Sequence, residues 1–228
     1  MKQRNDWLDL WRSLAVLTML VFHALWDLER FGLLPAGTME TPAANVIRYL
    51  GGGSFILISG ILVLRSRDPL RRGFRVLCIG LAVAVVTALI GLPVKFGILV
   101  LIGLCQMLCG ALRAKLETAR SGALACVFLL LFGASWYAVS RVSAPWNWLY
   151  PLGFRTADFF SADYWPLLPW AFLYLLGTQI GPLFERFGAG ERRLHAALTF
   201  LGRYSLVIYL AHQPLFYGIC YCFLQKPA

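Results

Sequence analysis

Charged side chains are scarce in this chain of 228 residues. They make up 14% of the sequence, whereas roughly a quarter of the residues in a soluble domain are charged. Hydrophobic residues make up 59%, and the mean hydropathy is +0.68. Apolar runs of about 17 to 21 residues recur along the sequence, each long enough to cross a bilayer core of about 30 Å. This composition excludes a soluble domain and predicts an integral membrane protein whose surroundings are the lipid bilayer.

Acidic residues are rarer than basic ones, so the formal net charge is +10. A basic chain of this kind raises the question of a nucleic-acid partner. The lysines and arginines, however, lie between the apolar runs, as the positive-inside rule of membrane proteins requires. We therefore expect no nucleic-acid partner.

Several signatures of other protein classes are missing. The sequence has no P-loop and no Gly-x-Gly-x-x-Gly motif of a soluble nucleotide site. The first apolar run is too long for a cleavable signal peptide and lacks its small-residue cleavage pattern, so we expect it to remain as a span. Cys105 and Cys109 share a helix face, but no histidine or carboxylate nearby completes a metal site. We predict no metal, and we interpret all the cysteines as small membrane hydrophobes.

We expect an all-α polytopic bundle of about seven transmembrane helices that forms a single domain, residues 1–228. The expected spans are roughly 7–28, 44–64, 75–92, 96–112, 122–140, 165–184 and 204–224. Residues 194–202 form either a short interfacial helix or the start of the last span. A cytoplasmic N-terminus puts most of the 21 lysines and arginines inside. An odd number of spans then puts the C-terminus outside.

Ionisable side chains inside the expected spans need a partner or a watery cavity. His23 and Asp27 lie one turn apart in the outer third of the first span. At this spacing the carboxylate can accept a hydrogen bond from the imidazole, which leaves the other ring nitrogen basic, as a general base requires. The alternative is an aromatic-belt helix end with a solvated Asp27. Asp9 and Arg12 can pair across one turn near the cytoplasmic end, where an ion pair would fix the depth of the helix.

Two further polar clusters lie near the sixth and the last span. His212, Gln213 and Pro214 follow one another at mid-membrane depth, which favours a polar cavity over a kink alone. Asp163 and Trp165 lie at the outer end of the sixth span, where the alternative to substrate binding is the aromatic belt of a membrane protein. On the cytoplasmic side, the loop from Arg65 to Arg75 is dense in arginine. Arginine binds phosphate bidentately, although membrane topology alone also favours positive charge here.

The sequence resembles the bacterial members of the heparan-alpha-glucosaminide N-acetyltransferase catalytic-domain-like family of transmembrane acetyltransferases. The matching stretches occur in the family's order and cover nearly the whole chain. They are LDLWRSLAVLTMLVFHALWDL, GGGSFILISGILVL, KFGILVLIGL, SADYWPLLPW and LGRYSLVIYLAHQPLFYG. Two positions depart from the bacterial pattern, since this chain has Ser13 where relatives tend to have glycine and Val100 where they often have histidine.

The resemblance implies a membrane enzyme that takes acetyl groups from cytosolic acetyl-CoA, its co-substrate. The acceptor would be an amine or hydroxyl of a sugar or glycoconjugate on the outer side of a bacterial cytoplasmic membrane. The resemblance is also compatible with a homo-oligomer. His23 would be the base or a transient acetyl carrier, oriented by Asp27. The expected acceptor-binding residues are Asp163, Trp165, His212 and Gln213, and the expected acetyl-CoA-binding residues are Arg12, Arg65, Arg71, Arg72 and Arg75. The alternative is a non-catalytic carrier or binding protein with a polar intramembrane cavity.

Overall fold

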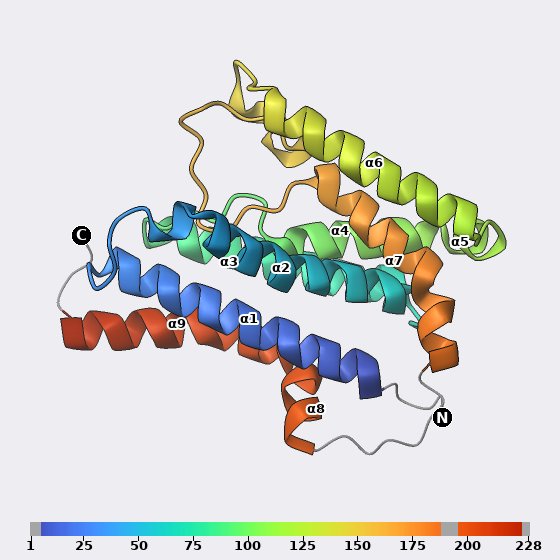
Figure 1. Ribbon diagram of the computed structural model, residues 1–228, viewed down its shortest axis with the longest axis horizontal. Coiled ribbons are helices and arrows are strands. Elements are labelled where there is room, and N and C mark those ends of the chain that lie inside the picture. The colour runs from blue at the N-terminus through green and yellow to red at the C-terminus, as the bar shows by residue number, and fades with distance from the viewer. Residues whose placement is uncertain (1–5, 188–195, 225–228) are drawn as a thin grey trace. The chain divides into compact units, whose positions relative to one another are not determined.

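A computed structural model describes residues 6–187 and 196–224, and this part of the chain is helical without any strand (Figure 1). The two 3₁₀ helices are η1 (Thr38–Glu40) and η2 (Asn147–Leu152). The α-helices are α1 (Asp6–Arg30), α2 (Pro42–Val63), α3 (Pro69–Leu89), α4 (Ile98–Ala111), α5 (Arg113–Thr118), α6 (Gly122–Arg141), α7 (Leu167–Phe187), α8 (Ala196–Arg203) and α9 (Ser205–Leu224).

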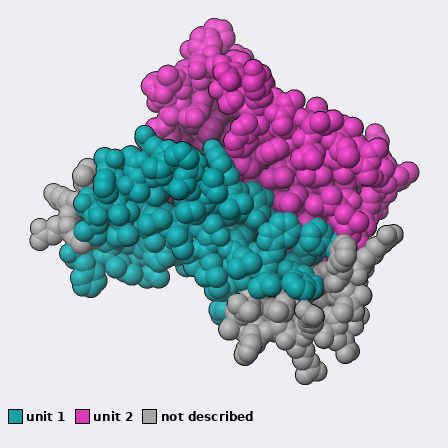
Figure 2. All heavy atoms as spheres, in the orientation of Figure 1, with its two compact units in different colours: residues 1–55, 184–228 teal, residues 56–183 magenta. Residues whose placement is uncertain are grey.

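Six of these helices are long and apolar enough to cross a membrane, namely α1, α2, α3, α6, α7 and α9. The shorter apolar helix α4 has 14 residues and extends about 21 Å at 1.5 Å per residue. The expectation of a polytopic all-α membrane protein is therefore confirmed. The described residues group into two compact units, residues 1–55 with 184–228 and residues 56–183 (Figure 2), and each unit is described here by itself. A single domain over 1–228 stays a prediction.

In the first unit, α1 and α9 lie side by side and run in the same direction (Figure 1). In three contacts between them, the residue numbers increase along both helices, as they do between parallel helices. His23 stacks on His212, Asp27 bonds to Gln213, and Phe31 meets Tyr217. Parallel first and last spans require an odd number of crossings, whereas six crossings would make them antiparallel. We therefore count α4 as the seventh span.

A separate short helix, α8, precedes α9 and packs on the start of α1. The Ser13 hydroxyl donates to the Asp9 carbonyl (2.9 Å) and accepts from the Gly202 amide (2.8 Å). Gly202 lies so close to α1 that a Cβ atom there would overlap the Asp9 backbone. Of the two alternatives for residues 194–202, the structure has a distinct helix from Ala196 rather than the start of the last span. Residues 194 and 195 lie outside the described residues.

Close backbone approach at glycine joins the helices of the second unit. In the antiparallel pair α3–α4, a Cβ at Gly73 would meet Gly103 and Met107, and one at Gly80 would meet Val100. In the pair α2–α7, Gly60 lies against the backbone of Tyr174 and Gly177. Such small residues let membrane helices approach closely where the lipid provides no hydrophobic driving force for their association.

The parallel α1–α9 pair and the positive-inside rule together predict a cytoplasmic N-terminus and an outer C-terminus. A reporter of cytoplasmic location fused after Arg113 should be active, and the same reporter fused after Ala228 should be silent. An active reporter at Ala228 would contradict the topology. A periplasmic reporter at the same two positions is the control and should give the opposite pattern.

Candidate active site

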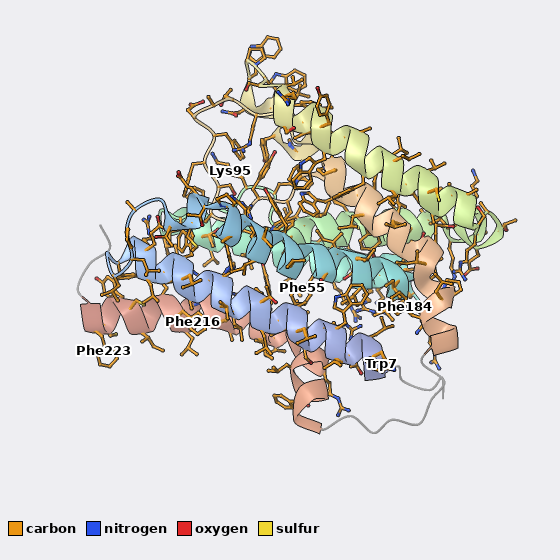
Figure 3. The ribbon with its side chains drawn as sticks, in the orientation of Figure 1. Trp7, Phe55, Lys95, Phe184, Phe216 and Phe223 are labelled. Atoms are coloured by element: carbon orange, nitrogen blue, oxygen red, sulfur yellow. The ribbon has the colours of Figure 1, made fainter. Side chains whose placement is uncertain are left out.

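A group of polar side chains in the first unit lies between α1 and α9. The imidazoles of His23 and His212 are stacked, with ring centroids 4.7 Å apart and planes inclined by 28°. Phe216, labelled in Figure 3, closes the cluster one turn along α9, edge-on to His212 at 6.0 Å. The structure thus brings together a histidine from the first span and one from the last.

His212 is held by its own helix. Its Nδ1 lies 2.7 Å from the Tyr209 carbonyl and 3.2 Å from the Ile208 carbonyl. Carbonyl oxygens only accept hydrogen bonds, so Nδ1 carries the proton and donates. In the neutral ring this leaves Nε2 as the hydrogen-bond acceptor. Pro214 lies two residues farther along α9, where it removes a backbone donor from the same stretch of helix.

Asp27 is fully buried, with 0% of its surface exposed. Its Oδ1 accepts a hydrogen bond from Gln213 Nε2 (3.0 Å). The expected hydrogen bond from His23 to Asp27 was wrong, because the described residues contain no bond between them. The His23 ring stacks on α9 instead, and α9 also supplies the donor to Asp27, so contacts between helices replace the bond within one turn.

Three polar atoms near this cluster are buried and have no hydrogen-bond partner within residues 6–187 and 196–224. They are Asp27 Oδ2, Gln213 Oε1 and Arg30 Nε. The Arg30 guanidinium lies 5.7 Å from the centre of the Trp26 ring. Leaving a buried polar group unsatisfied costs about 1–3 kcal/mol, and such a group in a folded protein is explained by strain, a catalytic role, or a bound water or ion. Two acceptors and one donor are therefore available to a polar ligand next to the stacked histidines.

At the other end of α1, the expected Asp9–Arg12 ion pair is confirmed. Arg12 Nη1 lies 3.1 Å from Asp9 Oδ1, and the carboxylate is almost fully buried. This pair fixes the arginine side chain in the first unit beside the contact of α1 with α8. A role of Arg12 in binding acetyl-CoA stays a prediction.

Asp163 and Trp165 lie in the second unit, where they hold the start of α4. Asp163 Oδ2 accepts from the Ile98 amide (3.0 Å), and Asp163 Oδ1 accepts from Trp165 Nε1. The Trp165 amide in turn donates to the Phe96 carbonyl (3.0 Å). A carboxylate at a helix N-terminus satisfies a free amide and interacts favourably with the helix dipole. These contacts give both residues a structural role, and acceptor binding by them stays a prediction.

Neighbouring residues support this loop. Lys95, labelled in Figure 3, lies with its ammonium 5.0 Å from the centre of the Phe159 ring. The Tyr164 hydroxyl donates to the Tyr150 carbonyl (2.7 Å). Burial raises the pKa of Tyr164 to about 12, so this hydroxyl keeps its proton, and its bond, at any physiological pH.

The sequence predicted a loop from Arg65 to Arg75, but only the first part of this segment is a loop. Helix α3 begins at Pro69, and the Asp68 carboxylate caps it by accepting from the Arg71 amide (2.9 Å). The Asp-Pro pair is the sequence signal for this start. Arg71, Arg72 and Arg75 therefore occupy the first two turns of α3, where all three are exposed, and Arg65 is half-buried.

Arg113 is a structural residue that the sequence did not identify. Its Nη1 donates to the Ser66 carbonyl (2.9 Å) and its Nη2 to the Leu64 carbonyl (3.0 Å). A cation that binds the last carbonyls of a helix also compensates the helix dipole. Arg113 thereby ties the start of α5 to the end of α2. Nothing in the sequence beyond a basic residue after an apolar run points to this contact.

Residues 4–214 match the family model described as "Heparan-alpha-glucosaminide N-acetyltransferase, catalytic". The chain belongs to this family. No curated protein and no solved structure matches the chain. Together with the apolar helices, membership identifies a multi-pass membrane protein of an acetyltransferase family.

The structural role of Asp163 can be separated from acceptor binding. Asp163→Ala should lower the free energy of unfolding by about 0.5–2 kcal/mol, the usual cost of losing an N-cap. If the role is structural, KM for the acceptor should not change when measured on folded protein. Asp158→Ala is the matched control, because Asp158 is exposed in the same loop and should affect neither quantity. A raised KM with unchanged stability would instead identify Asp163 as an acceptor ligand.

Proposed function

We propose that this protein transfers the acetyl group of cytosolic acetyl-CoA to an amine or hydroxyl of a sugar or glycoconjugate on the outer side of a bacterial cytoplasmic membrane. The observation that supports it most is the stacked pair His23–His212 next to the unpartnered oxygen of Asp27. As the acceptor nitrogen or oxygen bonds to the thioester carbonyl carbon, the C–S bond breaks and coenzyme A leaves as a thiolate that takes up a proton, while the acceptor must lose one. The imidazole of His23 is the base in this proposal, since a neutral imidazole has an unprotonated ring nitrogen that accepts a proton.

The surroundings of His23 suit a base. Its ring lies face to face with the ring of His212, whose Nδ1 proton is already committed to carbonyls of α9. Two cationic rings at this distance would repel each other in a medium of low dielectric constant. A neutral His23, able to accept a proton, therefore fits this packing.

The spacing of Asp27 from His23 suggested that the carboxylate orients the imidazole, but in this proposal the carboxylate positions the acceptor. Its Oδ1 is bound to Gln213, and its Oδ2 is left to accept a hydrogen bond from the acceptor. The carboxylate also stabilises positive charge that develops on the histidines as the proton is taken up. Asp27 then positions the acceptor, while stacking on His212 positions the base.

The donor side of the proposal rests on charge. Arg71, Arg72 and Arg75 fall within one face of α3, because Arg75 follows Arg71 by four residues and Arg72 by three. Cations near a helix N-terminus are unfavourable, by about 0.3–1 kcal/mol each. That cost is offset when an anion binds there, because the guanidinium groups then donate charge-assisted hydrogen bonds to its phosphates. The phosphates of coenzyme A carry the charge that this surface requires, and Arg65 is a further arginine of the same segment.

We predict that His23→Ala lowers the turnover of acetyl transfer by about 10²–10⁴, the usual contribution of a general base. Asp27→Asn keeps the bond geometry but removes the charge, so the loss should be smaller and should include a higher KM for the acceptor. Val21→Ala is the control on the same helix, because Val21 is 51% exposed. The measurement is transfer of labelled acetyl from acetyl-CoA to a panel of amino sugars and sugars by purified protein.

Two outcomes of this measurement would contradict the proposal. Near-normal turnover in His23→Ala would remove His23 as the base. If the wild-type protein acetylates no acceptor but moves a solute across vesicles without consuming acetyl-CoA, the chain is a carrier.

The phosphate surface gives a separate prediction. The double variant Arg71→Gln with Arg72→Gln should bind acetyl-CoA at least tenfold more weakly, because charge-assisted bonds contribute about 1.5–3 kcal/mol each. Arg120→Gln is the matched control, since Arg120 is an exposed arginine between α5 and α6. Titration calorimetry on protein that inserts normally measures both affinities. Equal affinities in the double variant and the wild type would exclude this surface from the donor site.

A further inference from the structure

Two basic side chains on the outer loops of the second unit lie against the same aromatic ring. The Lys95 ammonium lies 5.0 Å from the centre of the Phe159 ring, and the Arg155 guanidinium carbon lies 5.8 Å from it. Arg155 also lies 5.5 Å from the centre of the Tyr164 ring, which packs on Phe159 at 4.9 Å. Two positive charges are therefore held close to one ring, and so close to each other.

Hydrogen bonds of the backbone fix the positions of both residues. The Lys95 amide donates to the Ser161 hydroxyl (2.8 Å), which joins the loop between α3 and α4 to the loop before α7. The Arg155 carbonyl accepts from the Ala144 amide (3.1 Å), and Phe159 between the two cations is only 8% exposed. A binding group that is already held in place loses little conformational freedom when a ligand binds.

Neither basic side chain has a polar partner within the described part of the chain. The Lys95 ammonium and the Arg155 guanidinium form no hydrogen bond and no ion pair there, and both residues are exposed. Of the two carboxylates in this loop, Asp163 is bound to the start of α4, and the exposed Asp158 forms no ion pair with either cation. A ring face attracts a cation without occupying its N–H groups, so these donors remain available to an anion.

The location of the two cations indicates which anion they meet. Both loops lie on the outer side in the predicted topology, where the positive-inside rule favours few basic residues. The same loop carries Trp146 and Trp148, whose rings are stacked at 6.1 Å and which are 58% and 68% exposed. Asn147 between them accepts from the Thr156 amide (3.1 Å), directly after Arg155 in the chain. Exposed tryptophan is typical of the depth at which a membrane protein meets the lipid headgroups.

We propose that Lys95 and Arg155 bind the phosphate of an anionic phospholipid in the outer leaflet of the membrane. The lysine contributes a compact charge and the arginine a planar fork of donors, and both groups bind phosphate. The tryptophan stack contacts the lipid next to its headgroup. A soluble phosphate has the same oxyanion but lacks the apolar part that the tryptophans would contact. This site is independent of the proposed acetyl transfer.

Fluorine NMR of protein labelled with fluorinated tryptophan tests the site in detergent micelles, because Trp146 and Trp148 report on this loop. Their resonances are assigned from Trp146→Phe and Trp148→Phe. We expect phosphatidylglycerol to shift both resonances with an affinity about tenfold higher than that of phosphatidylcholine. In the double variant Lys95→Gln with Arg155→Gln, the affinity for phosphatidylglycerol should fall about tenfold, because the charge-assisted bonds are lost.

Controls separate lipid binding from a change in the fold of the loop. The double variant Lys115→Gln with Arg120→Gln removes the same charge from exposed residues on the cytoplasmic side, and the affinity reported by the loop should not change. The resonance of the buried Trp165 should be the same in all lipid-free variants. Lys95→Met keeps an unbranched side chain against the ring and removes only the charge, so it should also weaken binding of the anionic lipid.

Three results would overturn this proposal. Equal affinities of the wild type and both Lys95 variants for phosphatidylglycerol would exclude the basic pair. Equal affinities of the wild type for phosphatidylglycerol and phosphatidylcholine would show that the site does not select an anionic lipid. If soluble glycerol phosphate shifts the tryptophan resonances at the same concentration as the lipid, the ligand is a free phosphate and not the membrane.

Discussion

The hydrogen bond from Gln213 to Asp27 joins the first membrane helix to the last at a point where the carboxylate is fully buried. Loss of a hydrogen-bond donor to a buried carboxylate is strongly destabilising, so this contact fixes the register between α1 and α9. The same register stacks His23 on His212 one turn away and brings Phe31 to Tyr217. The position of the imidazole therefore depends on the last helix as much as on its own.

A second constraint acts where no polar contact joins the helices. Gly73, Gly103 and Gly80 let the backbones of α3 and α4 touch, so the two helices have no room to shift along each other. This rigidity fixes the three arginines at the start of α3 relative to the end of α4.

The sequence predicted the spans well, because helix length in a bilayer is set by the hydrocarbon thickness. It also identified His23, Asp27, His212 and Gln213 as polar groups inside spans, but not their pairing. Spacing within one helix favoured a His23–Asp27 bond, whereas the bond that forms crosses to α9, and a single sequence carries no signal for such contacts. Asp163 lies just before the start of α7, as the sequence indicated, yet its partner is the start of α4, 65 residues away along the chain.

The two departures from the bacterial pattern can now be interpreted from their contacts. The Ser13 hydroxyl bridges the Asp9 carbonyl and the Gly202 amide, so it strengthens the contact of α1 with α8. Val100 packs its side chain against Gly80, where an imidazole would need to push α3 and α4 apart. With valine there, residues 56–183 contain no histidine at all. Imidazole chemistry in the described chain is therefore confined to His23 and His212, on the helix pair that Asp27 and Gln213 hold in register.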